Sequence, residues 1–223
     1  MKGEIKNIQK PDLVLIDFDG VIAKNSPEII ANLFHKNLND ITPIKIEFII
    51  DFFRLVMSFP IEHSLEYLFN SLGLTEKEIN VFTEKYKKSI SENLNLFQIN
   101  DGFYDFIHFC KNKNIKYKVF SLAKDSRLSI LEIEQETFYN PGEMSKADKA
   151  TFFKVKKELH ANNVLYIDDS PLGLKTGKLT NMNTIMMFNS LFGIKDYFLY
   201  EEYIDFTAGS FYEIQKIICN YSH

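Results

Sequence analysis

Four short apolar runs constrain the fold of this chain more than any other feature. Each run is rich in Val, Ile, Leu or aromatic residues and is bounded by polar or turn residues, which is typical of strands buried on both faces. The runs cover residues 13–16, 117–120, 164–167 and 184–188.

Helical patterns separate these runs. Residues 102–112 and 147–159 each place apolar side chains on one stripe, the spacing of an amphipathic helix. The stripes are Phe103, Phe106, Ile107 and Cys110 in the first pattern, and Phe152, Phe153, Val155 and Leu159 in the second. Strands that alternate with helices predict an α/β fold, a Rossmann-like three-layer core with a parallel sheet covered on both faces.

The segment 24–97 breaks this alternation. It shows mostly helix-period patterns and no convincing strand, and Pro27, Pro43, Pro60 and Gly73 divide it into short helices. It is too long for one crossover connection. We predict an inserted α-helical cap domain at 24–97, with the core formed by 1–23 and 98–223. Extra helices packed on a single core are the alternative interpretation.

The bulk properties limit the partners. At 223 residues the chain is long enough for one α/β core and a small insertion, and its net charge of −4 without a basic stripe argues against nucleic-acid binding. The two cysteines favour a reducing compartment, and the polar N-terminus lacks an apolar signal region. Asp51 and Arg54 interrupt the longest apolar stretch, 46–59, which excludes a membrane span there. We expect a cytoplasmic protein without a membrane partner; its oligomeric state is unknown.

Two aspartates follow the first run. Asp17 and Asp19 are two residues apart, so in extended backbone their side chains point the same way, at the end of the strand where open α/β sheets bind ligands. Gly20 allows a sharp turn after them. A calcium loop of the D-x-D-x-D-G type is excluded, because an apolar step follows Gly20 and no glutamate stands at the required place.

A second acidic pair, Asp168 and Asp169, follows the third run. Because the ends of parallel strands meet at one edge of the sheet, we expect this pair to converge with Asp17 and Asp19. Carboxylates gathered around one point suit Mg²⁺. A single Asp-Asp pair would be interpreted as an exposed helix cap, but two pairs at two strand ends favour a metal site.

Ser121 and Lys146 are candidates for binding a phosphate. Ser121 ends the second run, where it either donates a hydrogen bond to a phosphoryl oxygen or caps a helix. Lys124 and Arg127 follow it and either add positive charge or lie in solvent. Lys146 starts the helical pattern 147–159, where a cation opposes the helix dipole. A lysine there needs a partner such as a phosphate or the aspartates.

Together these four segments resemble the haloacid dehalogenase superfamily. DFDGV at 17–21 is similar to its first motif, Ser121 in VFSLA to its second, KADKATFF from Lys146 to its third without the two prolines, and YIDDSPLGLKTGK from Tyr166 to its fourth. The resemblance spans roughly 13–188. The insertion resembles the helical cap of the subgroup that holds β-phosphoglucomutase and phosphoglycolate phosphatase. The segment 121–146 is short for this family, which predicts a trimmed helix or strand.

The resemblance implies a Mg²⁺-dependent phosphatase that acts on a small phosphorylated metabolite. Asp17 would be the nucleophile and Asp19 the general acid and base. The implied phosphate-binding residues are Ser121, Leu122, Lys124 and Lys146, and the implied metal ligands are Asp17, Asp19 through its carbonyl, Asp168 and Asp169. Asp19 favours phosphoryl transfer over carbon–halogen cleavage.

Two other functions stay open at this stage. A sugar phosphomutase is one, because Lys124 stands three residues after Ser121, much as such mutases place a phosphate-binding lysine. A non-catalytic binding module is the other. Within the cap, Lys45, Arg54 and His63 are the first polar residues to consider for substrate contact.

Overall fold

Six parallel strands form one sheet in the order β3-β2-β1-β4-β5-β6 in the computed structural model, which describes residues 9–123 and 126–220. The strands are β1 (Leu13–Ile16), β2 (Lys116–Phe120), β3 (Phe138–Tyr139), β4 (Val164–Asp168), β5 (Asn183–Met187) and β6 (Phe206–Ala208). The four predicted strands are confirmed to within one residue at each end. The edge strands β3 and β6 were not predicted, since two or three residues are too few to show a pattern.

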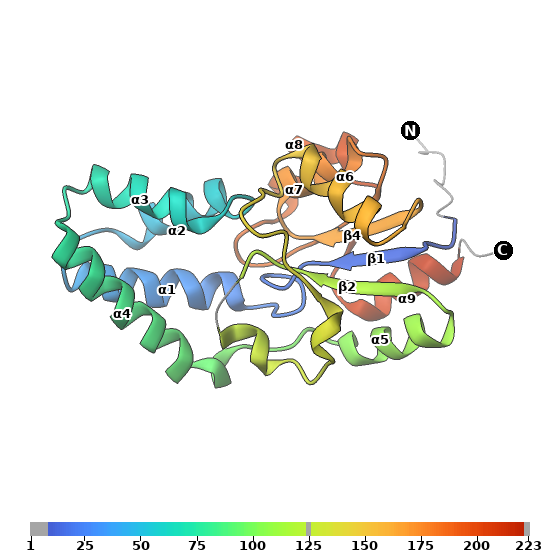
Figure 1. Cartoon of the computed structure of the whole chain (residues 1–223), viewed down its shortest axis with the longest axis horizontal. Coiled ribbons are helices and arrows are strands. Elements are labelled where there is room, and N and C mark those ends of the chain that lie inside the picture. The colour runs from blue at the N-terminus through green and yellow to red at the C-terminus, as the bar shows by residue number, and fades with distance from the viewer. Residues whose placement is uncertain (1–8, 124–125, 221–223) are drawn as a thin grey trace.

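Helices cover both faces of the sheet, as the α/β interpretation requires (Figure 1). On one face lie α5 (Phe103–Asn112) and α9 (Phe211–Asn220), and on the other lie α6 (Lys149–Glu158), α7 (Pro171–Lys178) and α8 (Ile194–Tyr200). The hydrophobic core therefore lies on both sides of β1 and β4, whose apolar residues are fully buried.

The two predicted helices differ in how well the sequence described them. In α5 all four stripe residues are buried. In α6 Phe152 and Val155 are buried, but Phe153 is 57% exposed. Adjacent residues on a helix point about 100° apart, so only one of the two phenylalanines faces the sheet. The predicted start was also wrong: Asp148 is the N-cap, accepting a hydrogen bond from Ala150 N at 2.9 Å, and Lys146 lies in the preceding turn.

The insertion after β1 is helical, as predicted. It contains α1 (Ser26–Asn39), α2 (Ile46–Val56), α3 (Ile61–Ser71), α4 (Glu76–Glu92) and the short 3₁₀ helix η1 (Leu94–Leu96). Its entry and exit lie side by side, because Lys24 N donates to Gln98 O at 3.0 Å. We call residues 24–97 the cap, which extends away from the sheet in Figure 1. The division of the chain into two domains at these residues stays a prediction.

The connection from β2 to β3 consists of short elements in its described part, and its trimming relative to the family stays a prediction. Residues 126–137 contain two 3₁₀ helices, η2 (Ser126–Ile130) and η3 (Gln135–Thr137), and no α-helix. In the part of the chain that the structure describes, no helix is both long enough and apolar enough to cross a membrane.

Candidate active site

Three aspartates meet at the carboxyl ends of β1 and β4. A carboxylate oxygen of each of Asp17, Asp168 and Asp169 lies within 4.8 Å of the others, and all three residues are buried. The strands themselves bring them together, since β1 pairs with β4 in parallel and Asp17 N donates to Ile167 O at 2.9 Å. The structure therefore brings these three residues together at the two strand ends, as predicted.

Lys146 lies inside this acidic cluster. Its Nζ is 2.6 Å from Asp17 Oδ1 and 3.2 Å from Asp168 Oδ2, and only 3% of its side chain is exposed. The ammonium also lies over the Phe120 ring, 5.1 Å from the centroid. A buried ammonium needs such partners. From the sequence, either a phosphate or the aspartates could pair with Lys146, and in the structure the aspartates do. The start of the helix does not position this lysine.

Burial and mutual repulsion govern the protonation of these groups. Burial raises the pKa of Asp17 to about 7, against the attraction of Lys146. Burial also raises the pKa of Asp169, and the negative charges of Asp168 and Asp17 raise it further. Burial disfavours the Lys146 ammonium, but Asp168 and Asp17 outweigh it and raise the pKa of Lys146 above its usual value. One lysine does not compensate three buried carboxylates, so the cluster favours a further cation.

The cluster fits a divalent metal ion. Oδ1 of Asp169 is buried and has no hydrogen-bond partner among the residues that the structure describes, which is unusual for a buried carboxylate oxygen. Its Oδ2 accepts from Asn189 Nδ2 at 2.5 Å, so one oxygen is fixed while the other is left for a ligand. An oxygen-only donor set of this kind suits a hard cation.

Asp19 stands apart from the three clustered acids. Its Oδ1 is 2.8 Å from Nη1 of Arg127, and both side chains are mostly buried. Its backbone bridges to Ala23, which begins the chain's path into the cap. The structure therefore places Arg127 at the site, where the sequence had left it undecided between an added charge and solvated surface.

The remaining predicted residues lie at the end of β2. Ser121 is 3% exposed, and its Oγ accepts from Ala123 N at 3.0 Å, a bond that does not use the hydroxyl proton. Leu122 is half-buried and lines a cavity that also contacts Asp19. Lys124 lies outside the described residues.

The sequence is similar to a known protein family. The chain matches the profile of the haloacid dehalogenase-like hydrolase family over residues 14–187. It belongs to this family. No curated protein sequence is significantly similar to it.

Solved structures of other proteins share the fold at low sequence identity. A hydrolase from Pseudomonas syringae has a TM-score of 0.74 at 12% identity, with 96% of this chain and 100% of that chain covered. A predicted phosphoglycolate phosphatase from Haemophilus somnus has a TM-score of 0.68 at 14% identity, covering 94% and 98%. A Thermotoga maritima protein proposed to be a β-phosphoglucomutase has a TM-score of 0.64 at 19% identity, covering 94% and 99%.

Two residues that were not predicted from the sequence, Asn189 and Tyr166, donate hydrogen bonds to the acidic cluster. Asn189 follows β5, and its amide reaches both Asp169 and the carbonyl of Gly20, the latter at 3.3 Å. Tyr166 in β4 donates its hydroxyl to Asp168 Oδ2. Asn189 could have been found as the first polar side chain after the fourth apolar run. Tyr166 gave no signal, because it sits within a buried strand.

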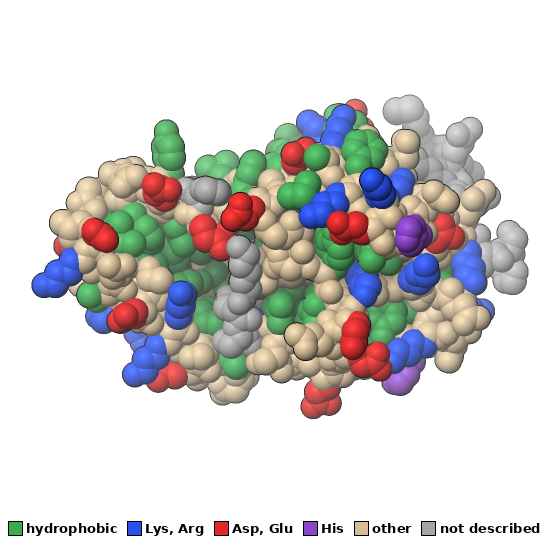
Figure 2. All heavy atoms as spheres, viewed as in Figure 1, with side chains coloured by type: hydrophobic (Ala, Val, Ile, Leu, Met, Phe, Trp, Pro, Cys, Tyr) green, Lys and Arg blue, Asp and Glu red, His purple; other side chains and the backbone are tan. Residues whose placement is uncertain are grey.

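A large cavity, which we call the cap cavity, opens beside Asp19. Its volume is about 650 Å³, and it is lined by all four cap helices and by Leu122, Ala123 and Arg127 of the core. Figure 2 shows the corresponding hollow, lined with hydrophobic side chains, between the cap helices.

Two of the polar cap residues singled out from the sequence, Lys45 and Arg54, do not line this cavity. Arg54 instead holds the core: Nη2 is 2.6 Å from Asp196 Oδ1 and Nη1 donates to Leu191 O at 3.0 Å. Lys45 is exposed at the start of α2. The side chain of His63 lies outside the described residues.

The loop between α2 and α3 is a second cap–core contact. Ser58 O accepts hydrogen bonds from Ser145 Oγ at 2.7 Å and from Ala147 N at 3.3 Å. Ser58 Oγ lies 2.6 Å from Ser170 Oγ. The cap therefore contacts both loops that carry the acidic cluster, one next to Lys146 and one next to Asp169.

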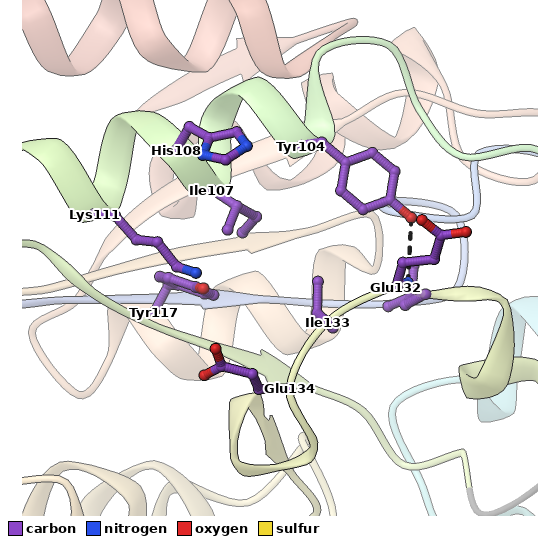
Figure 3. Close-up of a pocket in the computed structure, with 9 residues that line it drawn as sticks. Tyr104, Ile107, His108, Lys111, Tyr117, Glu132, Ile133 and Glu134 are labelled. Atoms are coloured by element: carbon purple, nitrogen blue, oxygen red, sulfur yellow. Dashed lines mark hydrogen bonds between the residues drawn. The ribbon is translucent and has the colours of Figure 1, made fainter.

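Another cavity lies along α5 and β2, away from the strand ends (Figure 3). It has a volume of about 470 Å³ and is lined by Tyr104, Ile107, His108, Lys111, Tyr117 and residues 131–134. Tyr104 OH accepts from Glu132 N at 3.4 Å across it. None of the clustered aspartates lines this cavity, so we do not assign it to catalysis.

Proposed function

We propose that the protein is a phosphatase that hydrolyses a small phosphorylated metabolite through a covalent intermediate on Asp17. The observation that carries the proposal is the 2.6 Å contact of Asp17 with Lys146 inside the buried cluster with Asp168 and Asp169. A nucleophilic carboxylate beside a fixed cation can both attack phosphorus and hold the charge of the transferring group.

In the first half-reaction, a carboxylate oxygen of Asp17 attacks phosphorus and the bond from phosphorus to the ester oxygen breaks. Asp19 donates a proton to the leaving oxygen, which departs as an alcohol. The product is an aspartyl-phosphate at Asp17. Asp19 suits this role because it lies two residues on, beside the cap cavity through which the alcohol would leave.

In the second half-reaction, Asp19 takes a proton from water while the water oxygen attacks phosphorus. Inorganic phosphate is released and the Asp17 carboxylate returns. Lys146 and the hydroxyl proton of Ser121 would hold the phosphoryl oxygens in both halves. Leu122 and Lys124 are proposed as further phosphate-binding residues, on the family resemblance alone.

Asp17, Asp168, Asp169 and the carbonyl of Asp19 are the residues that would hold Mg²⁺. When bound, the ion supplies positive charge that offsets the repulsion between the carboxylate nucleophile and the anionic phosphate. The unpartnered Oδ1 of Asp169 supports this assignment.

Release of inorganic phosphate from a panel of phosphate monoesters and acetyl phosphate, with Mg²⁺ present, tests the proposal. We expect wild-type activity that EDTA abolishes and that Asp17→Asn reduces by at least about 10³-fold, because removing a nucleophile removes the covalent route. Asp51→Asn is the matched control, since Asp51 is an exposed aspartate of the cap. Absence of turnover on every compound, or wild-type rates in Asp17→Asn, would contradict the proposal.

A further inference from the structure

Among the residues that the structure describes, the cap cavity is apolar along its walls and charged only at its two ends. Each cap helix contributes an apolar wall residue: Phe34 from α1, Phe53 from α2, Leu65 from α3 and Phe82 from α4. At about 650 Å³ the cavity is within the usual range of small-molecule sites and far larger than an ordinary packing void. It is therefore large enough to hold a substrate group.

The charged residues of the cavity lie at the solvent side and at Asp19. Glu62, Glu66 and Lys87 are exposed, so water already solvates them. At the inner end Asp19 and Arg127 face each other at 2.8 Å. Between these ends, the hydroxyl of Thr83 already donates to Ile79 O of its own helix at 2.8 Å. Tyr86 adds one more hydroxyl-bearing side chain to the wall. Among the described residues, the walls thus offer few groups that could pair with the several hydroxyls of a sugar.

This arrangement selects one kind of alcohol. A polyol placed against Phe34, Phe53 and Phe82 would leave hydroxyls without partners, which costs free energy for each one. An apolar group there would instead gain from burial. We infer, on the basis of the proposed phosphatase function, that the substrate is a phosphate monoester of a hydrophobic alcohol. Its ester oxygen lies at Asp19 and its apolar body fills the cap cavity.

A series of straight-chain alkyl phosphates from ethyl to hexyl measures this directly. The alcohols of the series are almost equally acidic, so the leaving group stays constant while the contact area grows. We expect kcat/KM to rise about fourfold for each added methylene, which makes hexyl phosphate up to about 250-fold better than ethyl phosphate. Glucose 6-phosphate, with six carbons but many hydroxyls, should be hydrolysed far more slowly than hexyl phosphate.

One substitution in the cavity locates the effect. Leu65→Asn places an amide in the wall and should lower kcat/KM for hexyl phosphate about tenfold more than it lowers kcat/KM for acetyl phosphate, whose small acyl group contacts less of the wall. Leu55→Asn is the matched control, because Leu55 is 74% exposed on the neighbouring helix and does not line the cavity. A circular dichroism spectrum equal to that of the wild type shows that the variant folds.

The outcomes separate this inference from the proposed function. A rising alkyl series that Leu65→Asn flattens supports it. A flat series, or preference for glucose 6-phosphate, together with Asp17-dependent hydrolysis of acetyl phosphate, overturns the inference and leaves the phosphatase proposal standing. Loss of Asp17-dependent hydrolysis for all compounds, acetyl phosphate included, overturns both.

Discussion

The acidic cluster and the cap cavity lie next to each other but differ in polarity. In the cluster, Asp17, Asp168 and Lys146 fill a buried space with charge, and only 3% of the Lys146 side chain is exposed. In the cap cavity, aromatic walls enclose about 650 Å³ and the nearest buried charges belong to Asp19 and Arg127. This difference underlies our proposal that the core supplies chemistry common to all substrates, whereas the cap distinguishes among them.

Replacing Lys146 is the strongest way to break this division. We expect Lys146→Met to lower kcat about 10²–10³-fold, as loss of one preorganised cation does. If the core supplies chemistry alone, the loss is equal for acetyl phosphate and hexyl phosphate. Lys149→Met is the control, because Lys149 is exposed in the first turn of α6. A loss confined to the long-chain ester would mean that Lys146 also serves recognition, and would break the comparison.

Replacing Gly20 tests how closely its backbone approaches the side chains of Asp169 and Asn189. Its φ is +76°, and a Cβ there would lie 2.2 Å from Asp169 Oδ2 and 2.3 Å from Asn189 Nδ2. Gly20→Ala should therefore displace Asp169 and lower kcat about 10²-fold on every substrate. Gly142→Ala is the matched control: Gly142 has the same φ of +76° with nothing within 4 Å of its Cβ position. Equal effects in the two variants would mean that backbone strain, not the close approach, matters.

Arg54 gives the smallest expected effect and concerns the contact between the cap and the core. Arg54→Met leaves the carboxylate of Asp196, only 12% exposed, without its 2.6 Å partner. Because the Arg54 side chain is 39% exposed, we expect a cost of only about 1 kcal/mol, or a Tm lower by about 2–4 °C. Lys88→Met, which removes an exposed pair with Glu92, should change Tm by less. Thermal unfolding followed by circular dichroism measures both, and an unchanged Tm in Arg54→Met would show that this contact does not hold the cap.

The sequence predicted the charged region far better than the apolar one. Asp17 and the Asp168–Asp169 pair each follow a fully buried strand, so their positions could be inferred from strand ends alone. The cap cavity depends on how four amphipathic helices pack, and a helical stripe such as Phe34 or Phe82 looks the same whether it faces a core or a cavity. Arg54, a cap residue that seemed a candidate for substrate contact, binds the core instead.

The two errors around Lys146 and Phe153 have local causes. The helical pattern extended through 147–159, but Asp148 caps the helix and begins it two residues later. Lys146 is consequently held by its contacts with the acids and not by a helix end. The helical pattern does not show whether the ring of Phe152 or that of Phe153 faces the sheet. In the structure Phe152 packs against Tyr166, with 5.1 Å between the ring centroids.

The hydrogen bonds of Ser58 have a thermodynamic consequence. They join the loop between α2 and α3 to Ser145 and Ser170, the neighbours of Lys146 and Asp169. Lifting the cap must break these bonds, so the free energy of opening includes them. By reciprocity, whatever stabilises the loops at Ser145 and Ser170 also favours the lowered cap, and by the same amount. We therefore expect a ligand that stabilises these loops at the proposed phosphate site to stabilise the contact of the cap with the core.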